Sequence, residues 1–364
     1  MNKKFLEELS RIASVKLVAK LKDERIGLNY PGEMRIFIPD LHMFSKARQQ
    51  DFNYECHTNY NEDGSALLPQ LAQFLLKFKT DNNDKNVLVY QLGDLLDIWR
   101  ETAKPWDIDP GDWQGIVQRI IRSNAPSWDA LVDDSLHTNF LLGNHDFDLH
   151  RIPTFYSRWQ FLRYYFSDES GTPVAGLLHG DIFVWYERFP DWIQQFFVYH
   201  YSPKDKSKKF IKKLDNAIRD THKRKGKYVN YEEYDDHKEL FDLGELVAPQ
   251  DVTEDVWNIK RKGEASKKEL KHLGKAKKLF SRVNNRTGYK LHMAVIGHTH
   301  HPRIAVDDSD DELFVLVDCG GWVKTSKASI EKEGNLEEVE VKNAQIGVLY
   351  NNEVCVYQLS PKES

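Results

Sequence analysis

The sequence is poor in cysteine, and it has no long hydrophobic run and no excess of basic charge. Its three cysteines, Cys56, Cys319 and Cys355, lie far apart and form no CxxC pair. This number and spacing argue against a disulfide scaffold and against a cysteine zinc site. No window reaches the roughly 18 apolar residues that a membrane-spanning helix needs. A net charge of −5 gives no overall electrostatic attraction to nucleic acid.

The N-terminal region lacks the uninterrupted apolar segment of a secretory signal peptide. Lys3 and Lys4 provide a basic start, but Glu7 and Glu8 then stand where that apolar segment would lie. We therefore expect a cytoplasmic protein. With 40% hydrophobic and 12% aromatic residues, a chain of 364 residues can bury a substantial core in one large domain or two smaller ones.

Strand-length apolar runs recur along the chain and alternate with segments of helical periodicity. The runs cover residues 35–38, 87–92, 139–142, 176–178, 293–296, 313–317 and 346–350, and the helical segments cover residues 3–22, 67–78 and 114–122. The dipeptide Asn351-Asn352 after the last run predicts the turn of a β-hairpin. This alternation is typical of an α/β fold, in which ligands bind beyond the carboxyl ends of the strands.

Polar motifs follow the first five of these runs directly. They are Asp40-Leu41-His42, Gly93-Asp94-Leu95-Leu96-Asp97, Gly143-Asn144-His145-Asp146, His179-Gly180-Asp181 and Gly297-His298-Thr299-His300. Mixed oxygen and nitrogen ligands of these types suit Mn²⁺, Fe or Zn²⁺, whereas Mg²⁺ and Ca²⁺ prefer oxygen ligands alone. The five motifs together predict a site for two divalent metal ions, Mn²⁺ or Fe/Zn.

The motifs also predict the chemistry of the site. Two cations about 3.5–4 Å apart can share a hydroxide and hold a phosphoryl oxygen, as in phosphatases and nucleases. Asp94 has two carboxylate oxygens and can bridge both ions. Because His145 is not needed as a ligand, we predict that it is the general acid toward the leaving oxygen, with Asp97 fixing its tautomer.

Each motif residue also has a purely structural explanation. Asp97 can cap the segment that follows it, Asn144 can form a β-turn, and His179 can be a hydrogen-bonded core histidine. Asp146 and Asp181 are expected to orient loops or ligands rather than to bind metal. The metal hypothesis is favoured because all the structural explanations would have to hold at once, and because five of the fourteen histidines fall in the motifs.

The five ordered motifs resemble those of the calcineurin-like metallophosphoesterase family, over residues 35–320. The resemblance implies a four-layer α/β/β/α sandwich that hydrolyses a phosphoester or pyrophosphate bond by in-line attack of a metal-bridging hydroxide. It implies that His145, oriented by Asp97, is the catalytic acid. The implied ligands are Asp40, His42, Asp94 and His300 for one metal, and Asp94, Asn144, His179 and His298 for the other.

Within this family, the motifs are nearest to the branch that contains the UDP-2,3-diacylglucosamine pyrophosphatases. Protein phosphatases of the family carry Arg directly after the second Asp of the second motif, where this chain has Ile98. Members of the pyrophosphatase branch often carry Arg at the position of His145. We therefore expect a phosphorylated small-molecule or nucleotide-containing substrate. Arg100, Arg188 and the aromatic residues of 183–197 are candidate contacts to it.

Charged residues dominate residues 201–289. Basic residues prevail in 204–227 and 260–290, and acidic residues prevail in 231–255. We predict a charged, mainly helical insertion, either a set of solvated helices or a cap whose basic faces hold an anionic substrate. The predicted domains are thus an N-terminal amphipathic helix and lead-in (1–34), a metallophosphoesterase domain (35–200 and 290–364) and this insertion (201–289).

Two other functions are compatible with the motifs. A nuclease of the same fold would use the basic stretches to bind DNA or RNA, and its binding would weaken steeply with salt. A non-catalytic scaffold would keep the fold to bind partner proteins. Such scaffolds usually lose ligands or the catalytic histidine, and this chain retains both.

Overall fold

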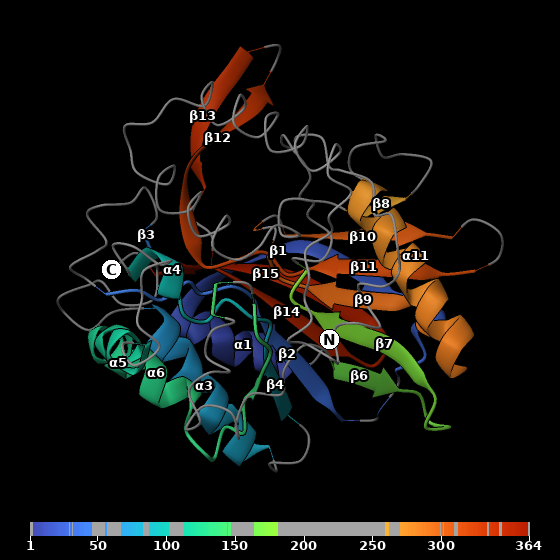
Figure 1. Cartoon of the computed structure of the whole chain (residues 1–364), viewed down its shortest axis with the longest axis horizontal. Helices are drawn as coiled ribbons and strands as arrows, with labels where there is room; N and C mark the ends of the chain where they lie inside the picture. The colour runs from blue at the N-terminus through green and yellow to red at the C-terminus, as the bar shows by residue number, and fades with distance from the viewer. Residues whose placement is uncertain are drawn as a thin grey trace.

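The strands form two large sheets in the computed structural model, which describes residues 3–28, 30, 32–45, 55–56, 67–82, 87–101, 113–143, 145–146, 164–180, 259–261, 270–298, 300, 302–308, 312–332, 335–341 and 344–362. The first sheet, in the order β1-β15-β14-β2-β4-β5, contains β1 (Ala13–Lys22), β2 (Met34–Ile38), β4 (Val87–Gln91), β5 (Asn139–Phe140), β14 (Gln345–Tyr350) and β15 (Glu353–Pro361). The second, in the order β6-β7-β9-β11-β10-β8, contains β6 (Tyr164–Ser167), β7 (Pro173–Leu178), β8 (Ile259–Arg261), β9 (Met293–Ile296), β10 (Arg303–Asp307) and β11 (Phe314–Asp318). Both sheets mix parallel and antiparallel pairs, so the predicted α/β class is confirmed (Figure 1).

Each of the seven predicted strand runs overlaps a strand of one of these sheets. The two predicted helices at 67–78 and 114–122 are α3 (Leu67–Asp81) and α5 (Trp113–Ser123). The predicted hairpin is confirmed as well, because β14 and β15 pair in antiparallel around Asn351 and Asn352. These two residues have φ angles of 48° and 56°, a left-handed conformation that Asn tolerates better than most residues.

The prediction of one amphipathic helix over residues 3–22 is wrong. The helix α1 covers only Lys3–Ile12. The chain continues as β1, which pairs with β15 along its length. From Ala13 onward, polar and apolar residues alternate on either side of a bulge between Leu17 and Ala19. The alternation and the bulge together place Val18, Ala19 and Leu21 in the core, so pairing with β15 outweighs the helical spacing.

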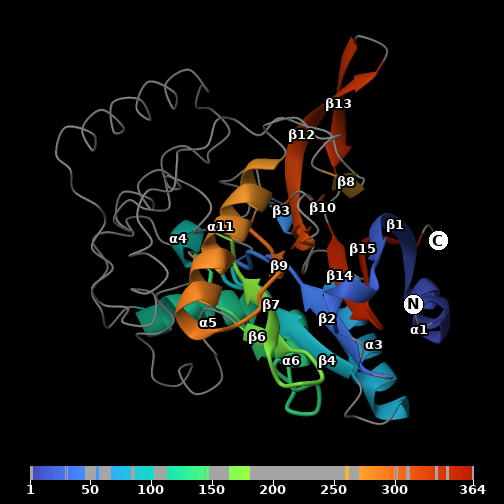
Figure 2. The same ribbon diagram turned by 90° about the vertical axis from the view of Figure 1, so that its right-hand side faces the viewer.

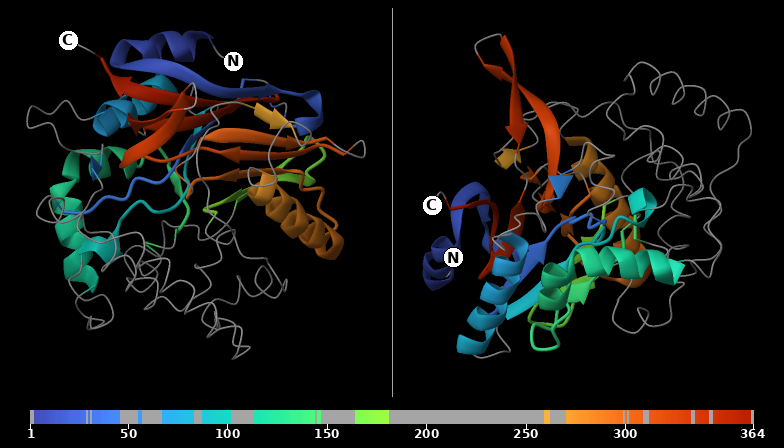
Figure 3. Two further views of the ribbon diagram at one scale, coloured as in Figure 1. Left: turned by 90° about the horizontal axis from the view of Figure 1, so that it is seen from above. Right: turned by 90° about the vertical axis from the view of Figure 1, so that its left-hand side faces the viewer.

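Three apolar cores separate the helices and the sheets. The first lies between one face of the first sheet and the helices α1, α3, α5 and α6 (Ala125–Leu131); the second lies between the two sheets; the third lies between the second sheet and α11 (Leu270–Thr287). Successive strand residues serve different cores: Ile36 faces the helices and Phe37 the other sheet, while Val315 faces the first sheet and Leu316 faces α11. Figures 2 and 3 show α1 and α11 on opposite sides of the molecule.

The last part of the predicted charged insertion belongs to these layers. Residues 259–261 form β8, which pairs with β10, and α11 packs Leu273, Ala276 and Phe280 against the second sheet. Residues 201–258 and 262–269 lie outside the described residues, so their predicted structure and their role as a cap stay predictions, as does the division into domains.

A smaller sheet projects from the two large ones. It has the order β13-β12-β3, with β3 (Glu55–Cys56), β12 (Val323–Lys332) and β13 (Asn335–Val341), and its long hairpin stands clear of the layers in Figure 1. The short helix α4 (Ile98–Glu101) follows the second motif. Within the described ranges, no helix is long and apolar enough to cross a membrane.

Candidate metal centre

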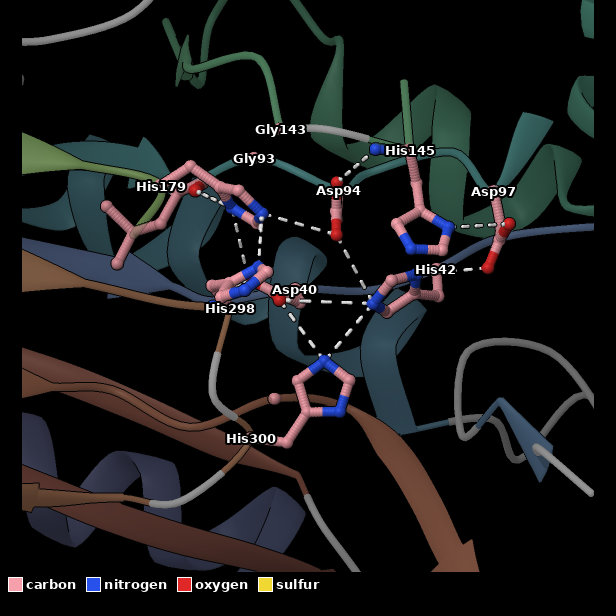
Figure 4. A network of polar contacts seen from close by, with 12 residues as sticks. Asp40, His42, Gly93, Asp94, Asp97, Gly143, His145, His179, His298 and His300 are labelled. Atoms are coloured by element: carbon pink, nitrogen blue, oxygen red, sulfur yellow. Dashed lines mark hydrogen bonds and ion pairs between the residues drawn. The ribbon is translucent and has the colours of Figure 1, made fainter. Parts of the chain in front are cut away.

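The predicted motifs meet at one end of both sheets. Asp40 follows β2 and Asp94 follows β4, two parallel neighbours in the first sheet. His179 follows β7 and His298 follows β9, two parallel neighbours in the second. Since carboxyl ends of parallel strands share an edge, the sheets bring the side chains together (Figure 4). The five predicted motifs therefore form one cluster, at least in their described residues.

One group of side chains spans the two sheets. Asp40, Asp94, His179 and His298 each place a ligand atom within 4.8 Å of the others. His298 Nδ1 lies 3.1 Å from His179 Nε2, which lies 3.3 Å from Asp94 Oδ2. His179 Nδ1 donates to the Leu92 carbonyl at 3.0 Å, so Nε2 is the nitrogen that faces the site.

A second group shares Asp40 with the first. It consists of Asp40, His42 and His300, again with ligand atoms within 4.8 Å of each other. His42 Nε2 lies 3.1 Å from His300 Nε2, which lies 3.2 Å from Asp40 Oδ2. Nitrogen ligands at about 2.1 Å from one tetrahedral or octahedral cation stand roughly 3.0–3.4 Å apart. The spacing thus fits one cation bound by all three side chains, and the mixed oxygen and nitrogen donors suit Mn²⁺, Fe or Zn²⁺.

Asp94, a member of the first group, also faces the second. Its Oδ2 lies 3.5 Å from His42 Nε2 and 3.3 Å from His179 Nε2. This placement agrees with a bridging role, although Asp40 is the residue common to both groups. The assignment of ligands to individual ions stays a prediction. So does the role of Asn144, which lies outside the described residues.

Asp97 links His42 to His145, and these three side chains form a third group whose ligand atoms lie within 4.8 Å of one another. Its Oδ1 lies 3.0 Å from His145 Nδ1 and its Oδ2 lies 3.1 Å from His42 Nδ1. The carboxylate is fully buried, so an oxygen that lost its imidazole partner would have no water to replace it. The contact between Asp97 and His145 was expected from the sequence. The contact with His42 was not, because the spacing of the motifs does not show which carboxylate oxygen faces which ring.

Asp146 ties the loops together, as expected. Its Oδ2 accepts a hydrogen bond from the Leu95 N–H at 2.7 Å, and its Oδ1 accepts one from the Gly143 N–H at 2.7 Å. Burial raises the pKa of Asp146 well above its usual value, and the neighbouring charge of Asp94 raises it further. Asp146 belongs to none of these three groups, so its contribution is to hold the second and third motifs in register.

Charge in the cluster is arranged for cation binding. Burial alone would raise the pKa of Asp94, but the imidazoles of His179, His145 and His42 hold it well below the usual value. Burial lowers the pKa of His298 well below its usual value, and His179 lowers it further. At neutral pH the site therefore offers an ionised carboxylate and a neutral imidazole, the forms that bind metal.

The backbone of the cluster is strained. Asp94 has φ of 49°, and His42, His298 and His300 have φ between 45° and 63°, in the left-handed region that side chains rarely adopt. Such conformations cost about 1–3 kcal/mol each and persist where the surrounding structure enforces them. Four predicted ligands with this strain support a functional site rather than a set of surface turns.

Two supporting residues carried no signal in the sequence. The side-chain Oε1 of Gln345 accepts a hydrogen bond from the Gly321 N–H at 2.9 Å, and the backbone carbonyl of Gln345 accepts one from the Trp322 indole at 2.7 Å. The Trp322 N–H donates to the Asp40 carbonyl at 2.8 Å. These contacts join segments far apart in the sequence, so only a homologue alignment or a structure can find them. The predicted substrate contacts Arg188 and 183–197 lie outside the described residues.

Replacing Gly297 by Ala should disrupt the centre. A Cβ on Gly297 would lie 2.2 Å from Asp40 Oδ1, so either the carboxylate or the loop must move. We expect weaker Mn²⁺ binding together with a lower melting temperature. The matched control is Gly274→Ala on α11, where a Cβ meets nothing within 4 Å, and which should stabilise by about 0.5–1 kcal/mol. Equal Mn²⁺ binding by Gly297→Ala and the wild type would contradict the observed packing.

No family model matches the chain, and no curated protein matches it. The geometry of the site shows buried Asp and His groups that can hold metal ions.

Proposed function

We propose that the protein is a dinuclear metal-dependent phosphoesterase, a hydrolase of phosphoester or pyrophosphate bonds. One observation carries the proposal: two cation-sized ligand groups share Asp40 and lie beside a hydrogen-bonded pair of Asp97 and His145. A lone metal site is common in proteins of many kinds. Two overlapping groups that share Asp40, with His145 outside these two, suit hydrolysis at phosphorus.

We further infer a four-layer α/β/β/α architecture of the metallophosphoesterase type. Support comes from the three apolar cores, which alternate helices, sheet, sheet and helix, and from the ligands at the carboxyl ends of both sheets. Two cysteines with free, buried thiols, Cys319 and Cys355, support a reducing compartment such as the cytoplasm.

The bound metal pair would supply a water of lowered pKa and would neutralise charge on the phosphoryl oxygens. Asp40, His42, Asp94, His179, His298 and His300 are the described residues that would hold it. Hydrogen bonds fix two of these ligands: His42 through Asp97 and His179 through the Leu92 carbonyl. Ligands held in advance lose little freedom when the ions bind.

His145 would protonate the leaving oxygen. Its Nδ1 is held by Asp97, so Nε2 is the position from which a proton can pass to substrate. Its backbone N–H donates to Asp94 Oδ1 at 2.8 Å, which fixes the acid relative to the metal ligands. Asp97 also stabilises positive charge on the ring. The product oxygen thereby leaves as a neutral hydroxyl.

The substrate class follows from this chemistry together with the sequence motifs: a phosphorylated small molecule or a nucleotide-containing diester or pyrophosphate. The test is a panel of aryl phosphomonoesters, aryl phosphodiesters and nucleotide pyrophosphates, assayed with Mn²⁺-loaded and chelator-treated protein in isotopically labelled water. Hydrolysis that requires Mn²⁺ and places the water oxygen on the phosphoryl product supports the proposal. Turnover of none of the three classes, or label on the alcohol product, would refute it.

A further inference from the structure

The loop that carries His298 and His300 crosses the end of a strand. It connects β9 to β10, and β11 lies between these two strands in the second sheet. Between Ile296 and Arg303 the chain must therefore cross the carboxyl end of β11. There Asp318 stands in register with Ile296 of β9 on one side and with Arg303 of β10 on the other. The positions of both histidines thus depend on how the loop is fastened to β11.

A buried ion pair fastens the far side of this loop. Arg303 is the first residue of β10, and its Nε lies 3.5 Å from Oδ2 of Asp318, the last residue of β11. Asp318 is fully buried, and the Arg303 side chain is 12% exposed. Nε makes no hydrogen bond to this carboxylate, so the link is electrostatic. Separating the two charges would leave a charge buried without its partner.

The helix α11 holds the same guanidinium. Arg303 Nη2 donates to Nδ1 of His272 at 3.0 Å, and His272 is buried near the start of α11. The planar guanidinium can contact a carboxylate and an imidazole at once, which the single ammonium of Lys does less well. One side chain therefore joins β10, β11 and α11 at the end of the sheet that bears the metal centre.

Asp318 is also linked to the ligands through a glycine turn. Its Oδ1 accepts a hydrogen bond from the Gly320 N–H at 3.3 Å. The next residue, Gly321, pairs with Asp40 and packs so closely that a Cβ on it would lie 2.9 Å from the His300 ring. Arg303 is thus connected to His300 along the chain and, independently, through Asp318 and this turn.

From these contacts we propose that Arg303 and Asp318 are positioning residues for the metal centre. They hold the crossing loop so that the His300 imidazole faces Asp40 and His42. This inference rests on the proposed metal centre and adds a function for residues that lie outside every sequence motif. The partners of metal ligands typically contribute about 10–100-fold to metal affinity.

The test is Mn²⁺ binding to metal-free protein, measured by competition with a chromogenic chelator, beside the melting temperature of each variant. Arg303→Gln should weaken one of two Mn²⁺ equivalents by about 10–100-fold, and Arg303→Lys by less. The double variant Arg303→Gln/Asp318→Asn removes the unpaired buried carboxylate, so it should recover thermal stability without recovering Mn²⁺ affinity.

The matched control is Lys277→Gln. It breaks another ion pair between α11 and β10, from Lys277 to Asp307 at 3.1 Å, at the end of β10 away from the centre. It should leave both Mn²⁺ affinities unchanged. Wild-type affinity in Arg303→Gln, recovery of affinity in the double variant, or an equal loss in Lys277→Gln would overturn the positioning role. If Arg303→Gln does not fold, Arg303→Lys and the double variant decide. Failure of the wild type to bind Mn²⁺ would instead overturn the proposed function.

Discussion

Replacing Asp94 by Asn should remove at least one of the two Mn²⁺ equivalents and lower hydrolysis by more than about 100-fold, the upper end of what loss of a mere supporting partner costs. The amide keeps an oxygen that can accept the His145 N–H, so the loop should stay in place. It lacks the negative charge that faces His42 and His179. The loss should therefore appear in metal content, measured by elemental analysis of the purified variant.

Asp307→Asn is the matched control for this variant. Asp307 is also buried and ion-paired, with Lys277 at 3.1 Å, but it lies at the end of β10 that points away from the metal centre. It should keep both Mn²⁺ equivalents and full turnover. If Asp94→Asn retained two equivalents with unchanged affinity, Asp94 would be a structural carboxylate and the shared-ligand interpretation would fail.

Replacing His145 by Ala should lower turnover by about 10²–10⁴-fold, the usual contribution of a positioned general acid. The two Mn²⁺ equivalents should be retained, because His145 lies outside both groups that contain Asp40. It belongs only to the group with His42 and Asp97, in which Asp97 already holds its Nδ1. The loss should be smaller for substrates with good leaving groups, since a stable leaving oxygen needs less protonation. A series of aryl phosphodiesters of different leaving-group pKa, assayed with both proteins, measures this dependence.

The alternative for His145 gives a different pattern. If its imidazole were a metal ligand, the Ala variant would lose Mn²⁺ and activity together, and the loss would not depend on the leaving group. Asp97→Asn separates the two roles of Asp97 in the same assay. Since Asp97 contacts both His145 and His42, its replacement should lower both turnover and Mn²⁺ affinity.

Local patterns in the sequence were sufficient for the strands and for most of the site. Asp40, Asp94, His179 and His298 each follow an apolar run, and parallel pairing of those runs brings their ends together. Short-range information fails where two patterns compete. Residues 13–22 fit a helix by spacing, yet they form β1 because they pair with β15. That pairing could not be predicted, because β15 lies more than 300 residues away and no local pattern reveals it.

The supporting contacts were beyond prediction for the same reason. Arg303 meets His272 and Asp318 only because the loop after β9 crosses β11, a consequence of strand order rather than of sequence spacing. Likewise, α11 reads as part of a charged insertion, although its apolar side covers the second sheet. Basic residues dominate its composition, whereas its buried apolar residues, Leu273, Ala276 and Phe280 among them, decide its place.

The central claim is that the clustered motifs form a two-metal centre that hydrolyses phosphoesters. The most direct test titrates metal-free protein with Mn²⁺ while hydrolysis of an aryl phosphodiester is followed. The account predicts no turnover before Mn²⁺ is added and saturation at two equivalents per chain, with Asp94→Asn inactive throughout. Undiminished hydrolysis without metal, or saturation of Mn²⁺ binding with no hydrolysis of any phosphoester, would contradict it.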